Sequence, residues 1–183
     1  DSGNNKTGTQ NLSYDSYWDG SVFQVWVHTA TNTVTHYTFD PSTDTWGAGS
    51  GAASTAMVGY RSIRGLKVPG NSELVVFGAD STDNSDLRYA RFASGSWTTA
   101  VILSITSTPS SRPIDIQASG NFAQMVYGDM ANLDLSWRSL TGATLGTETD
   151  ADTSYATSSE SDGIIGGRFN PWSSGGTPTI TVV

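Results

Sequence analysis

Residues 22–39 read VFQVWVHTATNTVTHYTF, and this stretch decides the fold class. Two runs within it, 22–27 and 34–39, are rich in β-branched and aromatic side chains, and turn residues separate them. This pattern is typical of two strands joined by a hairpin. No stretch of a dozen residues shows the spacing of an amphipathic helix. The sequence predicts an all-β, antiparallel protein, with further strands at 74–77, 87–92, 101–105, 114–116, 122–127, 133–140 and 179–183.

The strand pattern repeats along the chain. Trp26, Phe77 and Tyr127 each follow a valine in a matching segment, at spacings of 77 − 26 = 51 and 127 − 77 = 50 residues. Two further positions match between the units. One lies in the next strand, at Phe39, Phe92 and Leu140, and the other follows the turn after that strand, at Trp46, Trp97 and Leu145. A period of about 40–50 residues with several strands per unit is typical of propeller blades. We expect Trp26, Phe77 and Tyr127 to occupy equivalent buried positions.

This repeat predicts one propeller-like domain over residues 12–183, after an N-terminal tail at residues 1–11. The expected units are 12–59, 60–110 and 111–160, followed by a partial unit at 161–183. One unit cannot cover both faces of its own sheet, so the units must stack. A β-sandwich or jelly roll, in which the hairpins merely look alike, is the alternative fold.

The order of strands and turns resembles the blades of sialidase-like and fucose-lectin-like propellers. An aliphatic-aromatic strand, a polar hairpin, an aromatic strand and a turn ending in Trp follow one another over residues 12–150, and another unit starts at 163–183. The sialidase Asp box, Ser-x-Asp-x-Gly-x-x-Trp, is contracted here to Ser42-x-Asp44-x-Trp46 and lacks its glycine. The resemblance therefore implies the fold, and no catalytic residue is carried over.

The composition excludes several classes of function. The 183 residues include 26 Ser, 24 Thr and 20 Gly, but nine basic side chains stand against 17 acidic ones. The net charge of −8 argues against nucleic acid as a partner, because phosphate binding requires clustered Lys and Arg. No apolar run is long enough to predict membrane insertion, and zero cysteines exclude thiol chemistry. The hydroxyl-rich, lysine-poor composition predicts an extracellular protein at a cell or virion surface.

Aromatic residues outside the repeated strands are candidates for ligand binding. Tyr14, Tyr17 and Trp18 precede the first long strand, and Trp172 stands in a loop rich in Pro, Gly and Ser. Aromatic faces stack on sugar rings, while neighbouring polar side chains bond the sugar hydroxyls. The other interpretation of these residues is packing within or between blades.

Acidic clusters make calcium the one cofactor to consider. Asp80, Asp83 and Asp86 share a loop whose oxygens can fold around an ion, although their spacing is not that of an EF-hand. A second cluster alternates along the chain: Glu148, Asp150 and Asp152. The other interpretation of both clusters is a solvated acidic surface that keeps the protein soluble.

The two histidines flank a hairpin centred on Asn32. In that register His28 lies directly opposite His36, close enough to share a transition metal if a third ligand such as Asp40 joins them. The simpler interpretation is two exposed hairpin histidines.

Three functions remain open on these grounds. The first, favoured by the absence of a catalytic signature, is a non-catalytic module for assembly or adhesion, such as a subunit of a filament, spike or appendage. The second is a glycan-binding propeller lectin. The third is a sialidase-like glycoside hydrolase, which needs paired carboxylates and an arginine cluster. Candidate arginines lie near the starts of the units: Arg61, Arg64, Arg112 and Arg168.

The last strand predicts an assembly edge. It consists of Thr179, Ile180, Thr181, Val182 and Val183. A partial blade leaves backbone groups unpaired, so we expect a strand from another copy or a partner chain to complete it by β-augmentation. The alternative is that residues 12–18 return to close the ring.

Overall fold

The computed structural model describes residues 14–30, 33–54, 63–79, 86–104, 112–129, 134–152, 167–170 and 179–182. Every regular element in these ranges is a β-strand, and all pairings between them are antiparallel, as predicted. A search of the same ranges finds no helix long and apolar enough to span a membrane.

The strands form consecutive meanders, each built from neighbours in the chain. The first sheet is β1 (Tyr14–Trp18), β2 (Phe23–Ala30), β3 (Thr33–Asp40) and β4 (Thr45–Ser54). The second is β5 (Ile63–Lys67), β6 (Leu74–Ala79), β7 (Asp86–Ala93) and β8 (Ser96–Ser104). The third is β9 (Arg112–Ser119), β10 (Phe122–Asp129), β11 (Asp134–Thr141) and β12 (Thr144–Leu145), with β13 (Thr149–Asp152) also paired to β11. A separate pair is β14 (Gly167–Asn170) with β15 (Thr179–Val182).

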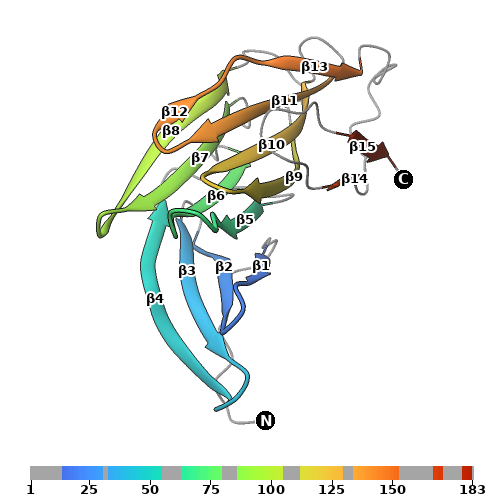
Figure 1. Ribbon diagram of the computed structural model, residues 1–183. Helices are drawn as coiled ribbons and strands as arrows, with labels where there is room; N and C mark the ends of the chain where they lie inside the picture. Colours follow the sequence, from blue (N-terminus) through green and yellow to red (C-terminus); the bar gives the residue numbers. More distant parts are fainter. Residues whose placement is uncertain are drawn as a thin grey trace.

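The three sheets follow one another in chain order, with the first and third on opposite sides of the second (Figure 1). Their leading strands β1, β5 and β9 are neighbours, and β14 lies beside β9. The described sheets do not close a ring. Consecutive meanders stacked face to face are the arrangement of propeller blades rather than of a two-sheet sandwich. The propeller-like fold is therefore confirmed, whereas the unit boundaries fall outside the described residues and stay predictions.

Strand register confirms the repeat at the outer strands. Phe39 pairs with Trp46, Phe92 with Trp97, and Leu140 with Leu145, in the places that the sequence matched. The ring centroids of the two aromatic pairs are 4.9 and 5.3 Å apart. Because cross-strand partners share a face, these pairs fix which face of each sheet is equivalent.

The central residues match only in part. Trp26, Phe77 and Tyr127 are all fully buried, as expected. Trp26 faces the second sheet and Phe77 the third, but Tyr127 faces backward and meets Phe77 at 6.2 Å in an edge-to-face contact. Trp26 and Phe77 each pair with the residue three positions before the matched outer residue of the next strand, and in the third sheet Val126 has that place. Tyr127 is one position further along, so its side chain points to the opposite face. The expectation that Tyr127 is equivalent to the other two is therefore wrong.

The first and second sheets approach most closely at Gly65. A Cβ atom at this position would lie 2.4 Å from the Trp26 ring, so only glycine leaves room for the indole. The Gly65 N–H donates to the Asp15 carboxylate across the same boundary at 2.7 Å. A large side chain on one sheet thus fits against bare backbone on the next.

Candidate functional site

A buried hydrophobic layer fills the boundary between the second and third sheets. Phe77 and Tyr89 of the second sheet pack with Met125 and Tyr127 of the third in one buried cluster. Alternating side chains of β6, β7 and β10 supply this layer, because strand residues two apart point to the same face. The two arginines at the margin of this layer, Arg91 and Arg138, lie on strands β7 and β11.

Three polar side chains gather at this boundary on the third sheet. Arg138 donates from Nε to the Tyr127 hydroxyl at 3.1 Å and from Nη2 to Glu148 at 3.2 Å. The Tyr127 hydroxyl donates to the same Glu148 oxygen. The side chains of Arg138 and Glu148 are 21% and 23% exposed, so solvent reaches the pair. We call Tyr127, Arg138 and Glu148 the Arg138 cluster.

The charges of the Arg138 cluster are fixed by its own contacts. Burial, followed by the hydrogen bond to Glu148, raises the pKa of Tyr127 far above its ordinary value, so the phenol keeps its proton. Burial works against the charged form of Arg138, but Tyr127 and Glu148 outweigh it and raise the pKa of the guanidinium. The cluster therefore offers an acceptor-rich carboxylate beside a permanent cation.

A second arginine pair faces the same boundary from the other sheet. Arg91 of β7 donates from Nε to Glu73 at 2.7 Å, and its Nη2 makes a second bond to the same carboxylate. The hydrogen bonds to Glu73 raise the pKa of Arg91. The two side chains are 17% and 15% exposed. The Arg91 Nη2 atom lies 3.9 Å from where a Cβ at Gly142, in the turn between β11 and β12, would stand.

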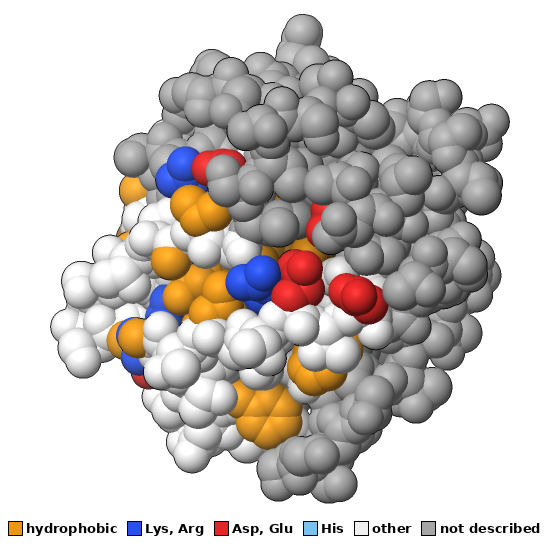
Figure 2. Space-filling model, turned by 90° about the horizontal axis from the view of Figure 1, so that it is seen from above, with side chains coloured by type: hydrophobic (Ala, Val, Ile, Leu, Met, Phe, Trp, Pro, Cys, Tyr) orange, Lys and Arg blue, Asp and Glu red, His pale blue; other side chains and the backbone are white. Residues whose placement is uncertain are grey.

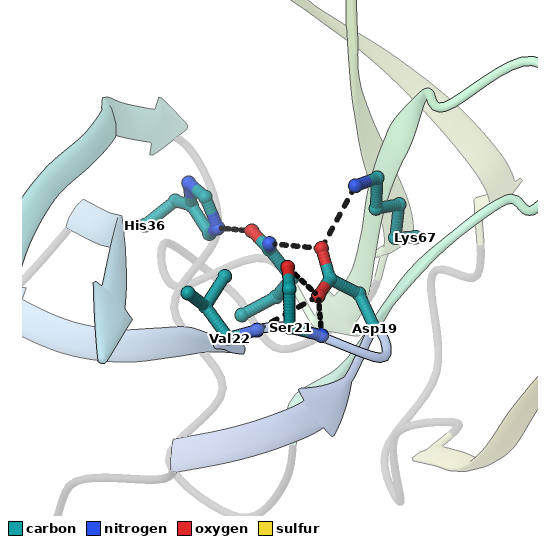
Figure 3. A network of polar contacts seen from close by, with 6 residues as sticks. Asp19, Ser21, Val22, His36 and Lys67 are labelled. Carbon is teal, nitrogen blue, oxygen red and sulfur yellow. Dashed lines mark hydrogen bonds and ion pairs between the residues drawn. The ribbon is translucent and has the colours of Figure 1, made fainter. Parts of the chain in front are cut away.

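The first and second sheets are joined by a polar chain instead (Figure 3). Lys67 and Gln24 both donate to the Asp19 carboxylate at 2.8 Å. His36 Nδ1 accepts from the Ser50 N–H at 2.9 Å, so its other nitrogen carries the proton and donates to Gln24 at 2.8 Å. Burial lowers the pKa of His36 to about 4. Every link is internal to the fold, which makes this chain a structural tie.

The aromatic binding candidates are not brought together. Tyr14 and Trp18 are 74% and 45% exposed and lie on the face of the first sheet that points away from the second. Tyr17 projects to the opposite face and packs against both core clusters. Trp172 lies outside the described residues. Alternation along β1 separates Tyr17 from its neighbours.

The metal candidates are also dispersed. Asp80 and Asp83 lie outside the described residues, and Asp86 accepts from Arg88 at 3.1 Å. Glu148 belongs to the Arg138 cluster, and Asp150 accepts from a serine hydroxyl at 3.5 Å. The side chain of Asp152 is not described. Among the described residues, no group of three His, Cys, Asp or Glu side chains could hold a metal ion.

The expected histidine pairing is wrong. His28 pairs with Val34, and His36 pairs with Trp26, because the hairpin closes with Ala30 opposite Thr33, one position away from the predicted register, and a bulge next to the turn shifts it by one more. Both histidines are buried rather than exposed. His36 is held by Gln24 and the backbone of Ser50.

The expected arginine cluster is not assembled from the described side chains. Arg64 lies on β5 and donates to the Ile63 carbonyl at 2.9 Å. Arg61 lies outside the described residues, and only the backbone is described at Arg112 and Arg168.

Sequence reasoning missed the Arg138 cluster. Tyr127 was expected in the core, and Glu148 in an acidic group. The available signal was Arg138 itself, a charged residue whose alternate neighbours, Ser136 and Leu140, prove to be buried. A cation on the inner face of a strand is uncommon unless it is paired.

Comparisons with known proteins identify the fold. No protein-family model matches the chain, and no curated protein matches it. Among solved structures, SapL1 lectin in complex with alpha methyl fucoside matches with a TM-score of 0.53 and 18% identity over 80% of this chain and 50% of that one. The Aleuria aurantia lectin in complex with Fucalpha1-6GlcNAc matches with a TM-score of 0.53 and 16% identity, over 80% and 47%. A variant of AofleA from Arthrobotrys oligospora matches with a TM-score of 0.52 and 12% identity, over 80% and 43%.

These similarities correct the favoured function. The chain spans about half the length of these structures. SapL1 and the Aleuria aurantia lectin are fucose-binding β-propeller lectins, so the expectation of an assembly or adhesion module is wrong, and the glycan-binding alternative is better supported. The described sheets resemble the propeller fold of these sugar-binding lectins.

Proposed function

We propose that this chain is a propeller lectin that binds carbohydrate at the Arg138 cluster. The observation that carries the proposal is a partly exposed arginine–glutamate pair, backed by a buried phenol, at the boundary of two blade-like sheets. The fold similarity to fucose-binding lectins supports the same conclusion.

The chemistry of the cluster suits a sugar. Each sugar hydroxyl is both a donor and an acceptor, so neighbouring hydroxyls can donate to Glu148 and accept from Arg138 at once. Such bonds to charged groups are stronger than neutral ones. Tyr127 holds both side chains from below, which reduces the ordering that binding requires.

The proposal includes an extracellular place of action, where glycans are displayed. The Ser- and Thr-rich, lysine-poor composition supports it. Recruitment of another copy through the last strand stays a prediction: β15 pairs with β14 along one edge, and Val183 lies outside the described residues.

A glycan array followed by calorimetry with methyl α-L-fucoside tests the proposal. We expect binding by the wild type and a loss of about 10- to 100-fold in Glu148→Gln, since a hydrogen bond to a charged group contributes about 1.5–3 kcal/mol.

Asp86→Asn is the matched control, because Asp86 forms a comparable half-buried pair with Arg88 outside the Arg138 cluster. Its affinity should equal that of the wild type. Absence of any array signal, or equal binding by Glu148→Gln, would refute the proposal.

A further inference from the structure

The two arginine–glutamate pairs at the boundary between the second and third sheets stand on the two faces that meet there, Arg91 on β7 and Arg138 on β11. Arg91 stands opposite Val75 on the face of the second sheet that meets the third, and Arg138 stands opposite Met125 on the face that meets the second. Both pairs are partly exposed. In the face drawn in Figure 2, basic and acidic side chains likewise border hydrophobic patches.

The strand between the pairs sets their separation. Arg91 lies beside the turn at Gly142, and Arg138 is four residues before that turn on β11. At about 3.3 Å per residue, the two positions are ~13 Å apart along the sheet, which exceeds the width of one sugar ring. Leu140 and Leu145 lie on the same face as Arg138 and form an apolar surface between Arg138 and the turn at Gly142.

We propose that this boundary binds an oligosaccharide in two subsites. One sugar residue lies at the Arg138 cluster, and the next lies at Arg91 and Glu73 beside Gly142. This inference rests on the proposed function and adds its ligand class, a glycan of two or more residues. The apolar C–H face of the chain packs on Leu145, while hydroxyls at both ends meet a carboxylate and a guanidinium.

Gly142 presents no side chain toward the Arg91 guanidinium, which lies 3.9 Å from where its Cβ would stand. Its φ of 56° lies in the left-handed region, which glycine adopts freely and asparagine tolerates. A side chain there would project toward the Arg91 guanidinium. Gly142→Asn therefore obstructs the second subsite while leaving both arginine pairs in place.

Calorimetry with methyl α-L-fucoside and with Fucα1-6GlcNAc tests the inference. We expect the wild type to bind the disaccharide at least about 10-fold more tightly, as one additional charged hydrogen bond implies. Arg91→Lys, which keeps the charge but loses the planar fork, and Gly142→Asn should both reduce this preference several-fold with unchanged affinity for the monosaccharide.

Arg88→Lys is the matched control. Arg88 lies on the same strand, points to the other face, and pairs with Asp86. It should leave both affinities unchanged. If the wild type shows no preference, or the preference survives in both variants, the second subsite is refuted and the lectin function stands. If neither sugar binds, both the second subsite and the proposed binding of fucosides at the Arg138 cluster are refuted.

Discussion

Acidification should weaken the fold through His36. His36 is 1% exposed, and its Nδ1 accepts from the Ser50 N–H, so a proton on Nδ1 would remove that bond and place a charge in the core. The pKa of His36 is lowered by burial from 6.5 to about 4. Because the folded-state pKa lies below the unfolded one, the stabilisation is complete above 6.5 and is lost as the pH falls toward 4.

The magnitude follows from the two pKa values. At about 1.4 kcal/mol per pH unit, the difference between 6.5 and about 4 corresponds to about 3.5 kcal/mol of unfolding free energy, of which about 3 kcal/mol is lost by about pH 4. This is a large share of the roughly 5–15 kcal/mol that stabilises a typical domain.

Urea unfolding at a series of pH values measures the effect, with His36→Gln as the reference. The glutamine does not titrate, while Asp19 and Lys67 are present in both proteins, so their titration largely cancels in the difference. We expect the stability advantage of the wild type over His36→Gln to fall by about 3 kcal/mol between about pH 7 and about pH 4. A difference that does not change with pH, or an imidazole NMR titration at or above 6.5, would contradict the burial argument.

Three further outcomes are expected. Gly65→Ala places a methyl group 2.4 Å from the Trp26 ring and should cost about 1–3 kcal/mol in urea unfolding; a change below about 0.5 kcal/mol would show that the sheets separate freely. Tyr127→Phe removes the hydroxyl that links Arg138 and Glu148 and should lower the free energy of unfolding by about 1–3 kcal/mol. Tyr14→Phe, at an exposed position, should change it by less than about 0.5 kcal/mol, and equal effects of the two variants would show that the Tyr127 hydroxyl does not stabilise the cluster. Because Asp86 already pairs with Arg88, a chelator should leave the melting temperature unchanged, and a fall would restore the 80–86 loop as a calcium site.

Local alternation was sufficient to predict the strands and much of the repeat. The sequence matched these residues between units, and in the structure they pair in the same register: Phe39 with Trp46, Phe92 with Trp97, and Leu140 with Leu145. This succeeded because each pair closes a short hairpin, where the turn fixes the register within a few residues.

Features that depend on one extra residue could not be predicted in this way. The first hairpin closes with Ala30 opposite Thr33, one position away from the predicted register, and a bulge adds one more, so that His28 pairs with Val34 instead of His36. A displacement by one position similarly reverses Tyr127 relative to Trp26 and Phe77, because the side-chain period of a strand is two. Neither displacement has a marker in the residue types.

The sequence by itself determined an all-β chain of stacked units, because hydrophobic periodicity and turn residues act over a few positions. Only the tertiary structure decided the candidate site. Tyr127, Arg138 and Glu148 come from β10, β11 and the segment after β12, and the second pair reaches the same boundary from another sheet. Which faces meet is set by how whole sheets pack, with Gly65 admitting Trp26 at one boundary and Tyr127 meeting Phe77 at the next. That packing sums contacts between residues 39 to 50 positions apart, and no local pattern encodes it.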